Sequence, residues 1–167
     1  MKTKGIQISD VKDGKCVPLG ELLENIPNEK QFFWALLWLD VTPLKDEGKY
    51  LIALEKKTNQ SENGLLLTFE SLLEISKKIF QEINVTIIAC KAKESLHHYK
   101  EDREMHETCD IVIEMIDGGF WEVFSKNVEW LNQLAKKFQD VEFLTLDFQT
   151  REISINLTRS TIRFRRL

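Results

Sequence analysis

The sequence has few of the residues that break or cross-link a chain. Its 167 residues include seven glycines, three prolines and three cysteines. So few glycines and prolines leave no room for a long flexible linker, and the length suits a single domain spanning residues 1–167. Cys16, Cys90 and Cys109 are odd in number and widely spaced. This usage argues against a disulfide framework and favours a reducing compartment.

The sequence also lacks a hydrophobic run long enough to cross a bilayer. The longest run, Phe32–Leu39, contains eight residues, whereas a membrane-spanning helix needs about twenty. The segment MKTKGIQISD contains no apolar stretch of the kind found in signal peptides. We therefore expect a cytoplasmic protein that does not enter the membrane. Trp34 and Trp38 lie within the apolar run, and burial in the core is the favoured interpretation for both.

Charge is distributed unevenly along the chain. The formal net charge is −4, but residues 159–167 contain four arginines and no acid. The rest of the chain carries 19 basic and 27 acidic residues, a net charge of −8. An acidic body disfavours nucleic acid as a ligand and suits a basic protein partner, which its electric field would steer. Contact between nucleic acid and Arg159, Arg163, Arg165 and Arg166 is a third hypothesis, and a charged strand edge that prevents aggregation is the simpler alternative.

Hydrophobic periodicity predicts an α+β fold. Apolar runs predict strands at residues 5–9, 31–41, 49–57, 65–67, 84–92 and 141–148, on both sides of 117–119, and within 152–167. Amphipathic spacing predicts helices at residues 17–27, 68–83 and 127–138, the last two capped by Thr68 and Asn127. We expect a mixed, mostly antiparallel sheet of six to eight strands, with about three helices packed chiefly on one face.

The clearest turn signal is Asp117-Gly118-Gly119, which separates two β-rich runs. Glycine tolerates the positive φ that a tight hairpin turn requires, so we expect Gly118 and Gly119 to adopt it. Phe120 and Trp121 follow the turn directly, where aromatic side chains are often half exposed. They and Asp117 are candidate contacts for a protein partner, and burial in the core is the alternative for both aromatic residues.

All three histidines fall within one acidic segment, residues 97–110 (HHYKEDREMHETCD). If this segment is helical, His98, His106 and Cys109 share one face, and all three are zinc-type ligands. A metal site, or an enzyme that pairs His106 with Cys109, is therefore the second hypothesis.

A solvated connector fits the same segment better, because it lacks a sustained apolar face. The sequence contains no third orienting group for the His–Cys pair, no phosphate-binding loop and no metalloprotease motif. We therefore expect no metal, no cofactor and no catalytic residue. The carboxylates of the connector become the candidate surface for a basic partner: Glu101, Asp102, Glu104 and Glu107.

Part of the chain resembles small uncharacterised proteins of Bacillus-type bacteria, some of which look like immunity proteins that neutralise polymorphic toxins. The resemblance covers about residues 84–148: a strand, a connector with Tyr99, CDIVIEMIDGGFWEVFSKN, a helix and a strand. Its most specific parts are Cys109-Asp110, the hairpin from Asp117 to an aromatic residue, and Ser125-Lys126-Asn127. The family pattern is shorter at the turn and more often has Asp after the lysine.

The resemblance implies a module that binds a protein and blocks it by occlusion, and it supplies no catalytic residues. The leading hypothesis is therefore a small cytoplasmic protein-binding module, possibly an immunity protein. The sequence defines neither the identity of the partner nor the oligomeric state.

Overall fold

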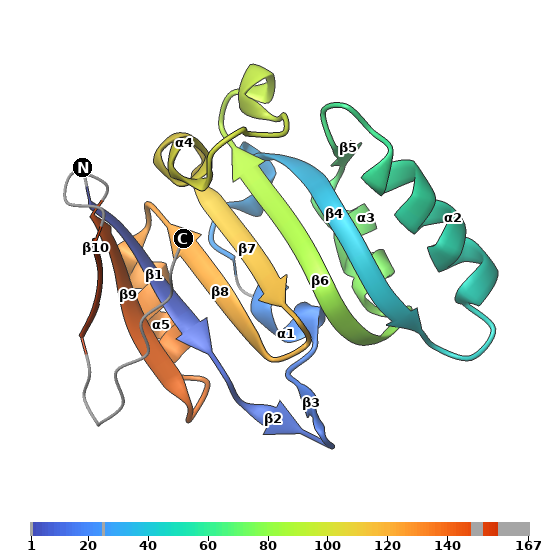
Figure 1. The fold of residues 1–167 in the computed structure, drawn as a ribbon, viewed down its shortest axis with the longest axis horizontal. Helices are drawn as coiled ribbons and strands as arrows, with labels where there is room; N and C mark the ends of the chain where they lie inside the picture. The colour runs from blue at the N-terminus through green and yellow to red at the C-terminus, as the bar shows by residue number, and fades with distance from the viewer. Residues whose placement is uncertain (1, 25, 148–151, 157–167) are drawn as a thin grey trace.

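A computed structural model describes residues 2–24, 26–147 and 152–156 and is organised around one eight-stranded sheet (Figure 1). The strand order is β10-β9-β1-β8-β7-β6-β4-β5, and every pairing between these strands is antiparallel. The strands are β1 (Lys2–Ile8), β4 (Phe33–Pro43), β5 (Leu65–Leu67), β6 (Ile79–Cys90), β7 (Ile111–Ile116), β8 (Phe120–Ser125), β9 (Val141–Asp147) and β10 (Glu152–Asn156). The expected fold class and number of strands are confirmed.

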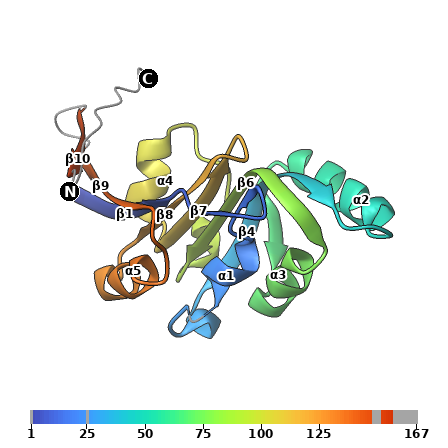
Figure 2. The same cartoon turned by 90° about the horizontal axis from the view of Figure 1, so that it is seen from below.

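Three helices cover one face of the sheet, which we call the helical face (Figure 2). They are α1 (Leu19–Leu23), α3 (Phe69–Ser76) and α5 (Val128–Ala135). The opposite face, called the open face below, carries only α4 (Asp102–Thr108) near one end of β7 among the described helices. Helix α2 (Gly48–Asn59) packs along β4 at one edge of the sheet. Smaller elements are the β2–β3 hairpin (Val11–Lys12, Lys15–Cys16) and the 3-10 turns η1 (Glu29–Gln31) and η2 (Lys93–Ser95).

The two faces of the sheet bury two separate hydrophobic clusters. The larger lies on the helical face and is built from Ile6, Ile87, Ile113 and Val123 of the sheet with Leu22, Leu72 and Leu131 of the helices. The smaller lies on the open face beneath α4 and η2, where Ile88, Val112 and Phe124 pack against Leu96 and Met105. Among the described residues, the segment 93–108 covers part of the open face, and Leu144 of β9 is buried in the same smaller cluster.

Two helix starts form at the expected capping residues. Thr68 Oγ1 accepts a 3.1 Å hydrogen bond from the backbone N–H of Ser71 at the start of α3. Asn127 Oδ1 accepts a 3.0 Å hydrogen bond from the backbone N–H of Trp130 at the start of α5. Each cap satisfies an amide that has no partner within the first helical turn.

The strand predicted at residues 49–57 is wrong, because this segment forms helix α2. Leu51 and Thr58 are buried, Leu54 is partly buried, and Ile52 is 66% exposed. Burial at intervals of three to four residues is the pattern of a helix that packs one face on a sheet. The short apolar run YLIAL fits both structures, and packing along β4 selects the helix.

The helix predicted at residues 68–83 is also wrong in its second half. Helix α3 ends at Ser76, and Ile79 already belongs to β6, where it pairs with Pro43. Glu82 is buried in this extension and accepts a 2.8 Å hydrogen bond from the backbone N–H of Leu19. Long-range pairing with β4 therefore overrides the local helical periodicity of residues 77–83.

The strand pairing separates the two tryptophans of β4. Trp34 is buried on the helical face, as expected, but Trp38 is 45% exposed, so its assignment to the core is wrong. The register of β4 against β6 shifts between Leu36 and Trp38. An irregularity of this kind reverses the side-chain alternation, and it places Trp38 on the open face.

Two further expectations depend on the limits of the described chain. Within the described ranges, no helix combines the length and the apolar character that crossing a membrane requires. A strand forms at Glu152–Asn156 as expected. Arg159, Arg163, Arg165 and Arg166 lie outside the described residues.

Candidate functional site: a cross-sheet row on the open face

Six residues of six neighbouring strands form one straight row across the open face. Trp38 pairs with Thr86, Thr86 with Glu114, and Glu114 with Glu122. The row then continues from Glu122 to Gln7 of β1 and from Gln7 to Glu142 of β9. We call this set the cross-sheet row; its members are Trp38, Thr86, Glu114, Glu122, Gln7 and Glu142.

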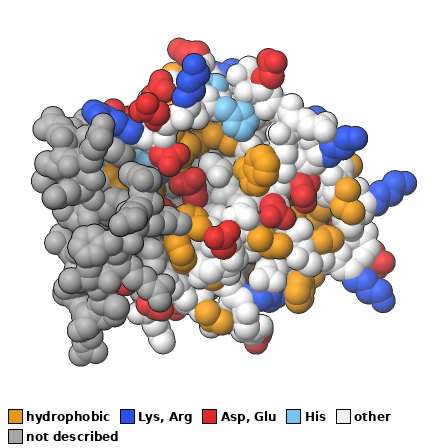
Figure 3. All heavy atoms as spheres, viewed as in Figure 1, with side chains coloured by type: hydrophobic (Ala, Val, Ile, Leu, Met, Phe, Trp, Pro, Cys, Tyr) orange, Lys and Arg blue, Asp and Glu red, His pale blue; other side chains and the backbone are white. Residues whose placement is uncertain are grey.

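The cross-sheet row combines three carboxylates with one half-exposed tryptophan. Neighbouring strands lie about 4.8 Å apart, so Glu114 and Glu122 project side by side, and Glu142 follows about two strand spacings further on. Trp38 is exposed, and the other five members of the row are partly exposed. Figure 3 shows acidic side chains gathered over the middle of this face, with hydrophobic side chains among them.

A hollow of about 170 Å³ lies at the tryptophan end of the row. Its lining joins the sheet to the segment before and within α4: Leu37, Trp38, Thr86, Glu114, His98, Tyr99, Asp102 and Met105. The Nε2 atom of His98 lies 3.1 Å from the backbone oxygen of Ser61. The hollow therefore offers an aromatic and apolar wall beside the carboxyl groups of Glu114 and Asp102.

Two further acidic residues lie close to each other near Trp38. They are Asp40, two residues after Trp38 in β4, and Glu55 of α2. Asp40 accepts a 3.3 Å hydrogen bond from Nδ2 of Asn84, and Oδ1 of Asn84 accepts one from the backbone N–H of Asp117. Burial raises the pKa of Glu55 on α2, and the nearby charge of Asp40 raises this pKa further. Asp40 and Glu55 therefore add two acidic side chains near the tryptophan end of the row.

Helix α4 brings a buried histidine next to the row. His106 is 6% exposed, its ring centroid lies 4.3 Å from that of Phe124, and its Nε2 lies 3.9 Å from Oε2 of Glu114. Burial lowers the pKa of His106 to about 4, although the charge of Asp102 opposes this shift. The imidazole is therefore neutral at physiological pH and packs as part of the core.

Cys109, the one cysteine of the predicted metal or catalytic cluster, lies beside Tyr99 and Cys90. The Cys109 thiol lies 3.8 Å from the Tyr99 hydroxyl, which donates a short 2.5 Å hydrogen bond to the backbone oxygen of Ser95. A hydrogen bond between the two thiols and burial together raise the pKa of Cys109. A buried thiol with a raised pKa is a poor nucleophile and a poor metal ligand.

His98, His106 and Cys109 are not brought together as a ligand set. In the described part of the chain, no three His, Cys, Asp or Glu side chains are grouped closely enough to hold a metal ion. His98 is exposed and directed at Ser61, whereas His106 and Cys109 are buried.

The predicted acidic connector is partly helical and less solvated than expected. Helix α4 buries Met105 and His106, so the segment has an apolar face after all. Glu101, Asp102 and Glu104 are exposed, and Glu107 is partly exposed and forms a 3.2 Å ion pair with Arg103. Only Asp102 of these four lines the hollow.

The hairpin residues divide between surface and core. Asp117 is exposed at the turn, and Phe120 is partly exposed on the open face, two residues before Glu122. Trp121 is 0% exposed, so its proposed contact with a partner is wrong and the alternative position in the core is confirmed. Trp121 faces the other way because successive side chains of a strand alternate between the two faces.

The sequence reasoning missed Trp38, Glu114, Glu122, Gln7 and Glu142 as members of one surface. Glutamate at alternate positions of apolar runs was a usable signal, since IVIEMI and FWEVF each contain one polar residue. That signal predicts that each glutamate points away from the core. It does not predict that they are neighbours, because their alignment depends on pairings between distant strands.

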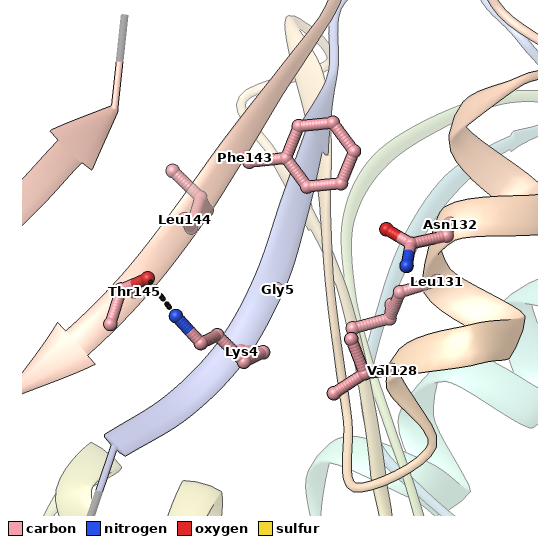
Figure 4. A pocket seen from close by; sticks show the side chains of 8 residues that line it. All are labelled: Lys4, Gly5, Val128, Leu131, Asn132, Phe143, Leu144 and Thr145. Atoms are coloured by element: carbon pink, nitrogen blue, oxygen red, sulfur yellow. Dashed lines mark hydrogen bonds between the residues drawn. The ribbon is translucent and has the colours of Figure 1, made fainter.

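A second hollow, of about 180 Å³, lies on the helical face between α5, β1 and β9 (Figure 4). Lys4 Nζ donates a 2.9 Å hydrogen bond to Thr145 Oγ1 at its side, and Val128, Leu131 and Phe143 supply apolar walls. Lys4 is the one ionisable side chain of its lining. This hollow therefore lacks the acid–base or nucleophilic pair that catalysis would require.

No family model matches this chain, and no curated protein or solved structure is similar enough to it to identify a relative. The fold and the surface define an α+β protein in which one face of an antiparallel sheet carries only α4 among the helices of the described chain. The resemblance to immunity-like proteins stays a prediction.

Proposed function

We propose that the protein is a binding module for a basic protein partner, and that the open face around the cross-sheet row is its docking surface. The observation that carries this proposal is the register: three carboxylates and a half-exposed tryptophan fall on one line across six strands. The proposed partner is a basic protein, as the sequence analysis predicted. The proposed docking surface is different: it is the open face of the sheet in place of the acidic connector and Trp121.

The chemistry of the row fits cationic side chains. Glu114 and Glu122 lie directly opposite each other in neighbouring strands, so one cationic group can reach both carboxylates. An arginine guanidinium placed between them would donate a charge-assisted hydrogen bond to each carboxylate. Carboxylates aligned in this way also raise the rate at which a basic partner is captured.

Trp38 supplies the apolar part of the same surface. Its ring borders the hollow with Leu37, Tyr99 and Met105. Large aromatic side chains that become buried on binding contribute most of the energy of many interfaces, and a tryptophan face also attracts cations. A partner that covers Trp38 and the three glutamates would be blocked by occlusion, and the sequence resemblance would make that partner a toxin.

A comparison of two charge-matched variants tests this proposal. Glu114→Gln/Glu122→Gln/Glu142→Gln removes the carboxylates of the row, and Glu70→Gln/Glu74→Gln/Glu129→Gln removes three exposed carboxylates from α3 and α5 on the other side. Wild-type chain would first be used to capture partners from the native cell. Association rates of the captured protein would then be measured with each variant across a salt series.

We expect the row variant to lower the association rate by about tenfold at low salt, and the helix variant to leave it nearly unchanged. Trp38→Ala should act mainly on dissociation, since a buried anchor holds the complex together. Equal effects of the two triple variants would contradict the proposal. Tight, salt-sensitive binding of generic RNA or DNA with no protein partner would also contradict it.

A further inference from the structure

The path of the last described strand leads to one end of the cross-sheet row. Strand β10 pairs with β9 from Glu152 opposite Asp147 to Asn156 opposite Phe143. Phe143 is the neighbour of Glu142 in β9, and Glu142 is the last member of the row. Asn156 therefore lies next to the end of the cross-sheet row that Glu142 forms.

The residues after Asn156 are long enough to cross the whole row. Glu142 and Glu114 are separated by three strand spacings, which is about 14 Å. Residues 157–167 lie outside the described residues, and eleven residues in extended form reach up to about 36 Å. Trp38, two strands beyond Glu114, is also within that reach.

The charges of the two parts are complementary. Residues 157–167 (LTRSTIRFRRL) contain four arginines and no acid, and they also carry Ile162 and Phe164 between the arginines. The row contains three carboxylates and ends at the apolar hollow beside Trp38. A segment attached next to its own binding surface acts at an effective concentration of about millimolar, so even weak contacts would be occupied.

We propose that residues 157–167 bind across the cross-sheet row of the same chain, with arginines at the carboxylates. The consequence rests on the proposed function: a basic partner must displace this segment before it can dock. Residues 157–167 then compete with the partner for the row. Only a partner that binds the row more tightly than this segment does would displace it. The arginines serve the acidic face in this proposal and are not a nucleic-acid site.

Limited proteolysis of the full chain tests the proposal without any partner. Trypsin cleaves after arginine, so Arg159, Arg163, Arg165 and Arg166 report whether residues 157–167 are accessible. Cleavage would be followed by intact mass for wild type, for Glu114→Gln/Glu122→Gln/Glu142→Gln, and for the control Glu70→Gln/Glu74→Gln/Glu129→Gln. Thermal unfolding by circular dichroism would confirm that each variant is folded.

At low salt we expect cleavage within residues 157–167 to be about tenfold slower in wild type and in the control than in the row variant. Raising the salt to about 0.5 M should remove the difference, because exposed ion pairs are screened. Equal cleavage rates of wild type and row variant at low salt would overturn the proposal. That result would leave the partner proposal standing, since association with the partner is measured separately.

Discussion

The indole Nε1 of Trp121 donates a 2.8 Å hydrogen bond to the backbone oxygen of Val17, a residue 104 positions earlier in the chain. Val17 is buried and directly precedes Pro18, after which α1 begins. The bond therefore ties the start of β8 to the residue pair that precedes α1 through the core. Trp121 has a structural role, whereas Trp38 lies exposed on the opposite face.

One substitution made at both tryptophans should separate these roles. Trp121→Phe removes the donor, leaves the buried Val17 oxygen without it and creates a cavity, so we expect unfolding free energy to fall by about 2–4 kcal/mol. Trp38→Phe should change it by less than about 0.5 kcal/mol, since the side chain is half exposed. Urea denaturation measures both values. Similar losses for the two variants would mean that Trp38 is packed in the core.

The turn between β7 and β8 depends on one glycine rather than two. Asp117 and Gly118 have φ values of 49° and 64°, and Gly119 is not among the residues with positive φ. The sequence prediction of positive φ is thus confirmed for Gly118 and wrong for Gly119. A two-residue turn with positive φ at both central positions matches the right-handed twist of the paired strands.

Alanine substitutions should show the same distinction. A Cβ at Gly118 would have its nearest neighbours 3.5 Å away, an ordinary contact, so the cost of Gly118→Ala comes from the backbone. We expect Gly118→Ala to lower the unfolding free energy by about 1 kcal/mol and Gly119→Ala to change it by less than about 0.5 kcal/mol. Thermal denaturation of the two variants provides the measurement. A larger loss of unfolding free energy for Gly119→Ala than for Gly118→Ala would contradict the positive φ at Gly118.

The buried His106 should make stability depend on pH. Burial lowers its pKa from 6.5 to about 4, so the unfolded chain binds a proton below pH 6.5 that the folded chain does not bind until about pH 4. The stabilisation that this histidine gives is therefore complete above pH 6.5 and is lost as the pH falls through 4. The full shift corresponds to about 3 kcal/mol.

A variant without the imidazole isolates this contribution from that of the carboxylates. The unfolding free energy of wild type minus that of His106→Leu should fall by about 3 kcal/mol between pH 7 and pH 4. His98→Leu is the control, because His98 is exposed. A pH-independent difference between wild type and His106→Leu would show that the imidazole titrates alike in the folded and unfolded chains.

Asn59 should stabilise β4 beyond the residues that pair with β5, because its side-chain amide makes the two hydrogen bonds that a neighbouring strand would make to Leu39. Its side-chain amide accepts a 2.9 Å hydrogen bond from the N–H of Leu39 and donates a 2.8 Å hydrogen bond to the oxygen of the same residue. We expect Asn59→Ala to lower the unfolding free energy by about 1–3 kcal/mol. Asn59→Asp should be no better, because a carboxylate repels the Leu39 oxygen.

Urea denaturation of these variants beside Asn132→Ala, an exposed asparagine of α5, measures the effect. Since an unprotected strand edge can pair with another chain, Asn59→Ala should also increase light scattering at high protein concentration. Equal stability of Asn59→Ala and wild type would mean that water replaces the amide at no cost.

Local signals in the sequence identified the parts of the fold that depend on neighbours in the chain. The caps at Thr68 and Asn127 and the turn at 117–119 are such parts, because a cap or a turn is decided by backbone geometry within four residues. The acidic character of the chain before residue 159 also follows from residue type alone.

The tertiary structure decided the features that depend on distant pairing. Residues 49–57 became a helix and residues 79–83 a strand because packing on β4 and pairing with β4 outweighed weak local preferences. The candidate site belongs to the same group. Alternation places Glu114 and Glu122 on the surface, but only the registers of β6, β7, β8, β1 and β9 align them with Trp38 and Glu142. A shift of one residue in a single pairing would move a strand's side chains to the opposite face, and the free energy that prevents it comes from the core, which forms only when the whole sheet does.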